Sequence, residues 1–111
     1  MNSTINEYIQ QNYNRNLEHN VTVGDKTELL NVVWLDQYNA IVCYKSSEFV
    51  MYPVKSYGTI KRTYHFEHLT IDQDKVKSIW FDRRTSLKAH KDALKAFIAQ
   101  YKTEHYLSLI G

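Results

Sequence analysis

The amino-acid sequence predicts an α+β fold. In it a strongly bent antiparallel β-meander, forming a small barrel or a sheet, is flanked by an N-terminal helix and a longer C-terminal helix. First, β-branched and aromatic residues form three short runs within residues 29–62, as they do in strands. Second, polar clusters typical of turns interrupt or end these runs, at residues 36–39, 45–48 and 53–58. Third, apolar residues recur at helical spacing near both ends of the chain. With 111 residues, the chain has room for a single domain, residues 1–111.

The N-terminal helix is predicted over residues 4–17. Thr4 and Glu7 match the capping-box pattern that begins many helices. The apolar residues that follow share one face of a helix. They are Ile5, Tyr8, Ile9, Tyr13 and Leu17. A short strand is predicted next, at residues 21–23, before a turn at residues 24–26.

The strands of the meander follow this turn. Residues 28–35 place Leu30, Val32 and Trp34 on one face, and Leu29, Val33 and Leu35 on the other. Because a strand that is apolar on both faces is usually covered on both, we expect this strand to be central in the sheet. Residues 40–44 and 49–52 continue the meander. Pro53 is expected at a strand end or a sheet edge, since proline has no amide hydrogen to donate.

The second half of the chain combines a hairpin with a long helix. Along residues 59–69, mostly apolar and aromatic side chains alternate with polar ones, which predicts a half-exposed strand. Residues 76–81 are expected to pair back on this strand. Thr70 and Gln73 also match a capping box, so a short helix there is the alternative. The last helix begins after Thr85 or Ser86 and runs to residue 109. Its apolar face consists of Leu87, His90, Leu94, Phe97, Ile98, Tyr101 and His105. The predicted core consists of Leu30, Val32, Trp34, Ile41, Val50, Leu94 and Phe97.

The sequence carries no recognised catalytic or cofactor motif. Glycine is too scarce for a phosphate-binding loop, and no serine or cysteine lies in a nucleophile motif. Cys43 lies in an apolar run, so a buried, unreactive thiol is expected. On a strand, His65 and His68 point to opposite faces, which disfavours a shared zinc ion. We therefore expect no enzyme, no metal and no cofactor. Neither a secretion signal nor a long apolar run is visible, so a cytoplasmic protein without a membrane segment is expected.

Charge is distributed unevenly along the chain. Residues 1–54 hold 3 basic and 6 acidic side chains, a net −3, whereas residues 55–111 hold 11 basic and 6 acidic ones, a net +5. The basic residues that cluster in the sequence are Lys55, Lys61, Arg62, Lys75, Lys77, Arg83 and Arg84. If their strands are adjacent, they form a positive face that attracts phosphate backbones. Alternatively, they are the charges with which exposed strand edges prevent aggregation.

One part of the pattern resembles a known family. A short helix, Val-Thr-Val, a turn at residues 24–25, a long strand ending in Leu-Asp-Gln-Tyr and two strands ending in Met-Tyr occur in that order over residues 4–60. This order resembles the Hfq/Sm-like RNA-binding family. The resemblance implies that Gln37 and Tyr38 lie on an RNA-binding face and that Lys55 takes the place of a basic contact. The sequence departs from the family by lacking its histidine after Met51-Tyr52 and its mid-strand glycine. Residues 61–111, a hairpin and a helix, are an extension.

Two classes of function follow. As a binding module for single-stranded RNA, the protein neutralises phosphates with Lys55, Lys61 and Arg62, while Tyr38 stacks on a base and Gln37 reads its edge. As a small protein-interaction factor, such as a phage or mobile-element inhibitor of a host defence or regulatory protein, it binds a protein target instead. A homo-oligomer is expected in either case, because the last helix carries apolar residues on more than one side.

Overall fold

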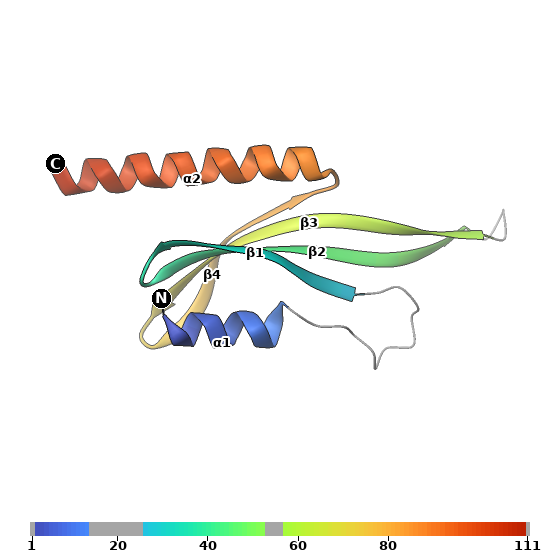
Figure 1. The fold of residues 1–111 in the computed structure, drawn as a ribbon, viewed down its shortest axis with the longest axis horizontal. Helices are drawn as coiled ribbons and strands as arrows, with labels where there is room; N and C mark the ends of the chain where they lie inside the picture. Colours follow the sequence, from blue (N-terminus) through green and yellow to red (C-terminus); the bar gives the residue numbers. More distant parts are fainter. Residues whose placement is uncertain (1, 14–25, 53–56, 111) are drawn as a thin grey trace.

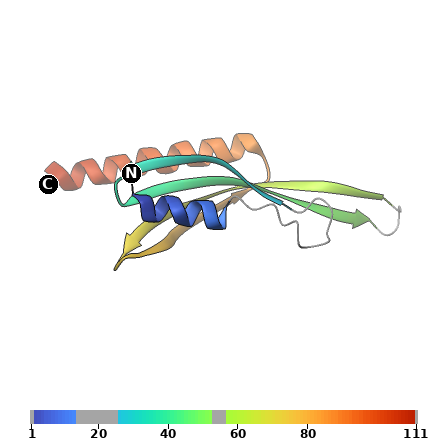
Figure 2. The ribbon, with the colours of Figure 1, turned by 60° about the horizontal axis from the view of Figure 1, so that its bottom comes forward.

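The computed structural model describes residues 2–13, 26–52 and 57–110, with side chains described for residues 2–13, 27–48 and 58–105. Two helices lie on opposite sides of a four-stranded antiparallel sheet (Figures 1 and 2). The elements are α1 (Ser3–Asn12), β1 (Lys26–Asp36), β2 (Asn39–Tyr52), β3 (Tyr57–Asp72), β4 (Lys75–Arg84) and α2 (Leu87–Ile110). The strand order is β1-β2-β3-β4. The predicted α+β meander between two helices is confirmed, in its open-sheet form and not as a barrel.

Helix α1 covers one face of the sheet. The side chain of Asn2 accepts hydrogen bonds from the amides of Thr4 (2.9 Å) and Ile5 (3.3 Å), so Asn2 caps the helix, and the predicted capping residue Thr4 is wrong by two positions. Ile5 and Ile9 are fully buried against Ala40, Val42 and Leu69, together with Tyr13. The helix ends at Asn12, and Leu17 and the strand predicted at residues 21–23 lie outside the described residues.

Strand β1 lies at an edge of the sheet, so its predicted central position is wrong. Its apolar residues are nevertheless covered on both faces: Val32 and Trp34 pack in the cluster under α1, whereas Val33 and Leu35 pack in the cluster under α2. A β-bulge between Leu29 and Asn31 shifts the alternation by one residue. As a result Leu29 joins the cluster under α1, and the predicted core residue Leu30 is 42% exposed.

Strands β2 and β3 form the longest hairpin. The turn predicted at residues 45–48 is wrong, because these residues lie inside β2 and continue its pairing with residues 61–64 of β3. Their polar side chains are compatible with a strand here, since the far part of the hairpin extends beyond both helices as an arm (Figure 1). Val50, on this arm, has no described side chain, so its predicted core position lies outside the described residues.

Strand β4 returns from β3 through a tight turn. Gln73 and Asp74 both have positive φ, 51° and 63°, as a two-residue hairpin turn requires. The hairpin prediction is therefore confirmed, and the short helix beginning near Thr70 is wrong.

Helix α2 covers the other face of the sheet. The Ser86 hydroxyl accepts a hydrogen bond from the amide of Ala89 at 3.0 Å, as predicted for a capping residue. Leu94, Phe97 and Ile98 pack on Ile41, Cys43 and Phe66, which confirms the predicted apolar face in its middle part. Burial raises the pKa of the Cys43 thiol to about 11, so the thiol is inert. Within the described chain, no helix is both long and apolar enough to cross a membrane.

Candidate functional site

The residues predicted to bind RNA do not come together. Gln37 and Tyr38 form the exposed turn between β1 and β2, where the Asp36 carboxylate accepts a hydrogen bond from the Tyr38 amide at 2.7 Å. Lys61 lies opposite Glu48, nine positions along β2 from Asn39 at the turn, which corresponds to about 30 Å. No single nucleotide spans that distance. Lys55 lies outside the described residues.

The basic cluster is divided between the two faces of the sheet. Strands β3 and β4 are adjacent, and His65 and Tyr64 lie opposite Arg83 and Arg84. Because side chains alternate along a strand, Arg62 and Arg84 point to the α2 side, whereas Lys61 and Arg83 point to the α1 side. Lys61 and Arg83 line a polar pocket of about 240 Å³, whose other lining residues are Ser46, Glu48, Thr63 and His65. The two strands therefore carry cations on both faces and form no single positive surface.

A polar cluster lies beneath α1. The Glu67 carboxylate accepts hydrogen bonds from the hydroxyls of Tyr44 and Ser78, each at 2.6 Å. Burial, followed by this hydrogen bond and the charge of Glu67, raises the pKa of Tyr44 well above its ordinary value. The Tyr44 ring stacks on His65 with centroids 4.7 Å apart. These hydroxyls remain protonated and donate to a carboxylate, so the cluster has a structural role in joining β2, β3 and β4.

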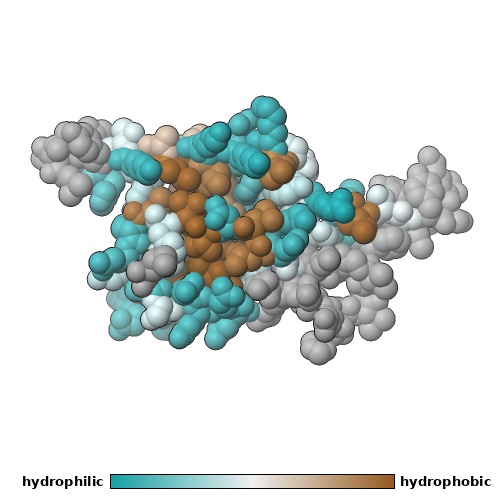
Figure 3. All heavy atoms as spheres, in the orientation of Figure 1, coloured by the Kyte–Doolittle hydropathy of each residue, from teal (hydrophilic) through white to brown (hydrophobic). Residues whose placement is uncertain are grey.

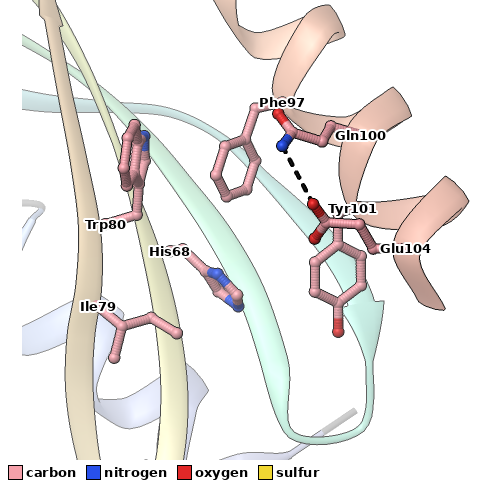
Figure 4. A pocket seen from close by; sticks show the side chains of 7 residues that line it. All are labelled: His68, Ile79, Trp80, Phe97, Gln100, Tyr101 and Glu104. Atoms are coloured by element: carbon pink, nitrogen blue, oxygen red, sulfur yellow. Dashed lines mark hydrogen bonds between the residues drawn. The ribbon is translucent and has the colours of Figure 1, made fainter. Parts of the chain in front are cut away.

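Three consecutive large apolar residues on β4 are more than half exposed: Ile79 (55%), Trp80 (52%) and Phe81 (54%). The ladder with β3 pairs Ser78 with Leu69 and Trp80 with His68, which leaves Ile79 as the extra residue of a bulge. A bulge interrupts the alternation of side chains. Ile79 and Trp80 therefore both line the side of the sheet that faces α2, as Figure 4 shows. Phe81 points to the other side, where its ring lies 5.7 Å from that of His65.

Ile79 and Trp80 form one wall of a groove of about 390 Å³ between β4 and α2 (Figure 4). Its other lining residues are His68, Phe97, Gln100, Tyr101 and Glu104. The indole of Trp80 stacks on Phe97, with centroids 6.0 Å apart and the planes at 28°. Gln100 donates a hydrogen bond to Glu104 at 3.1 Å on the helical rim. The groove is thus lined mainly by aromatic rings, with amide and carboxylate groups at its edge.

The base of the groove is formed by His68, which is buried, and Tyr101, which is half-buried. The His68 ring packs edge-on against Phe97 and Tyr101, and its Nε2 lies 2.9 Å from the Asn39 side-chain oxygen. Burial lowers the pKa of His68, although the charge of Asp36 acts in the opposite direction. The Tyr101 hydroxyl donates to Asp36 at 3.1 Å, which ties α2 to the turn between β1 and β2. The histidine is therefore neutral and held in place.

This arrangement is suited to binding. Over the residues that the structure describes, no group of three His, Cys, Asp or Glu side chains is placed to hold a metal ion. In the groove, His68 and Tyr101 are both engaged by other side chains, and its lining includes no serine, threonine or cysteine. The geometry can accept an apolar side chain between Trp80 and α2, where it would be removed from water.

A second apolar surface lies between α2 and α1 on the face seen in Figure 3. Strand β1 runs between the two helices in the same view (Figure 1), and on it Leu30 is exposed, whereas Val32, Val33 and Trp34 are half-buried. These three residues already pack in the clusters under the helices, whereas Ile79, Trp80 and Phe81 are each more than half exposed. The groove beside β4 is therefore the better candidate for a binding site.

Sequence reasoning placed residues 76–81 in a strand and missed the site. The available signal was the run Ile79-Trp80-Phe81 itself, since a regular strand cannot bury three consecutive large side chains on one face. Comparison with known families, curated proteins and solved structures finds no match to this chain.

Proposed function

We propose that this protein is a non-catalytic protein-interaction factor, whose target binds in the groove between β4 and α2. The observation that carries the proposal is the exposure of Ile79 and Trp80 by more than half on the side of β4 that faces α2, beside a groove lined with aromatic rings. Exposed contiguous apolar patches on small proteins usually mark interaction sites. Tryptophan is also among the residues that most often dominate the energy of an interface.

The size of the patch suits a short segment of a partner. On the groove side, half of the surface of one aromatic side chain, Trp80, and one aliphatic side chain, Ile79, amounts to about 200 Å². At about 25 cal/mol per Å², covering this area contributes roughly 5 kcal/mol before the entropy of association is subtracted. Such a contribution supports a specific complex when polar contacts at the rim add to it.

Single-stranded RNA is less well supported by the geometry. Trp80 and Phe81 point to opposite faces of the sheet, so they cannot stack on successive bases of one strand. One side of the Trp80 ring is already covered by Phe97. Tyr38 and Gln37, which are predicted to contact the RNA bases, lie about 30 Å from Lys61, which is predicted to contact a phosphate. RNA binding, the cytoplasmic location, self-association and an inhibitory role against a host protein stay predictions.

The experiment that tests the proposal is affinity capture from the native cell with three forms of the protein: wild type, Trp80→Ala and Tyr38→Ala. Tyr38 is a matched control, since it is an aromatic residue that is 58% exposed and does not line the groove. We expect the wild type and Tyr38→Ala to capture the same protein, whether or not the lysate is treated with nuclease. Trp80→Ala should not capture this protein. Nuclease-sensitive capture that depends on Tyr38 would instead support RNA binding.

A further inference from the structure

We propose that the segment bound beside β4 is extended, apolar at its centre and acidic at both ends. This inference rests on the proposed function and specifies the chemistry of the partner. Its basis is the combination of an open sheet edge, a central apolar patch and cations at both ends of the same strand.

The outer edge of β4 is open. In the sheet order β1-β2-β3-β4, strand β4 pairs with β3 and with no other described strand. The regular stretch Trp80–Arg84 follows the bulge and leaves outward-facing backbone amides and carbonyls along this edge. An extended segment can hydrogen-bond to such a row, while the groove takes one of its side chains.

Positive charge lies at both ends of the apolar patch. Lys75 and Lys77 precede it, Arg83 and Arg84 follow it, and Asp82 is the one acidic residue of the strand, so the ten residues carry 4 − 1 = +3. Lys77 pairs with Asp72 at 2.8 Å, and Arg84 pairs with Asp82 at 3.0 Å. Lys75 and Arg83 form no ion pair with any residue in the described ranges, and both are exposed.

The spacing of these two cations sets the length of the partner segment. Lys75 and Arg83 lie opposite Asp72 and His65, which are seven residues apart on β3, or about 23 Å. An extended segment of about nine residues therefore reaches both, with its middle residue beside Trp80. A groove of about 390 Å³ at that position has room for one large apolar side chain.

A second copy of the chain fits this edge poorly. Two identical edge strands related by a two-fold axis run antiparallel, which would bring the end of β4 that carries Lys75 and Lys77 alongside the end that carries Arg83 and Arg84 in the other copy. Like charges directly opposite each other destabilise strand pairing. The exposed apolar area of about 200 Å² on the groove side is also smaller than the 800 Å² or so that each partner buries in a standard interface. The same cations that oppose self-pairing favour an acidic partner.

The test uses the full chain and two labelled nine-residue peptides, followed by fluorescence anisotropy. One peptide is Glu-Glu-Leu-Thr-Phe-Thr-Leu-Glu-Glu, and the other has lysine in place of each glutamate. We expect the acidic peptide to bind at least tenfold more tightly at low salt, and the difference to shrink as salt is added. The double variant Lys75→Gln/Arg83→Gln should weaken acidic-peptide binding about fivefold or more. The matched control Lys91→Gln/Lys95→Gln, on exposed positions of α2, should leave it unchanged.

The outcomes separate this inference from the proposed function. Equal binding of both peptides, lost with Trp80→Ala, would overturn the acidic preference and leave the groove as the binding site. Binding of neither peptide, while Trp80→Ala still abolishes capture of a cellular protein, would overturn the extended acidic segment alone. Self-association that Trp80→Ala abolishes in analytical ultracentrifugation would show that a second copy occupies the edge. Preference for a single-stranded uridine oligonucleotide over the acidic peptide would refute both proposals.

Discussion

Replacing Ile9 by alanine tests how α1 is held on the sheet. Ile9 is fully buried against Ala40, Val42 and Leu69. Because a ten-residue helix is marginal in water by itself, α1 depends on this contact. The substitution removes three carbon atoms, which corresponds to about 2.4 kcal/mol of transfer free energy at 0.8 kcal/mol each. The cavity left behind raises the expected loss to about 3 to 4 kcal/mol, a large fraction of the stability of a small domain.

Ile79→Ala is the matched control, because it removes the same atoms from a side chain that is 55% exposed. Its expected cost is below about 1 kcal/mol. Urea unfolding followed by circular dichroism gives the free energy of unfolding of both variants and of the wild type. If Ile9→Ala costs no more than Ile79→Ala, α1 does not contribute to the core as described, and the packing argument is refuted.

Two further predictions concern buried polar groups. Burial lowers the pKa values of His65, His68 and His90 in the folded protein, so the unfolded chain binds protons more readily. The contribution of these neutral histidines to the free energy of unfolding should be complete above about pH 6.5 and should be lost as the pH falls toward 5. A urea midpoint that is the same at pH 7.5 and pH 5.5 would contradict this reasoning. Glu67→Gln should cost about 1 to 3 kcal/mol, since Tyr44 and Ser78 lose a charged acceptor. Ser78→Ala, which removes one of these two bonds, should cost less by the same urea assay, and a wild-type midpoint for Glu67→Gln would show that the bonds contribute little.

Much of the fold could be predicted from local spacing. Apolar residues three and four positions apart indicate α1 and α2, because each helix buries one stripe of side chains. Alternation along residues 59–69 and 76–81 indicates a hairpin, because successive side chains of a strand point to opposite faces of the sheet. Each of these patterns is the repeat of one helix or one strand, so residues close together in the sequence are enough to reveal it. Element ends were less well predicted, as the cap at Asn2 and the unbroken β2 show.

The position of the candidate site was decided by pairing between strands. The bulges at Leu30 and Ile79 arise where one strand has an extra residue relative to its partner, and a two-residue period carries no information about such an insertion. The edge position of β1 likewise follows from strand pairing, and β1 is apolar on both faces because one helix covers each face of the sheet. The sequence by itself determined the helices, the meander and the excess of cations in the second half of the chain. The tertiary structure alone determined that Ile79 and Trp80 share one side of β4, because a side chain's face follows from the register between two strands.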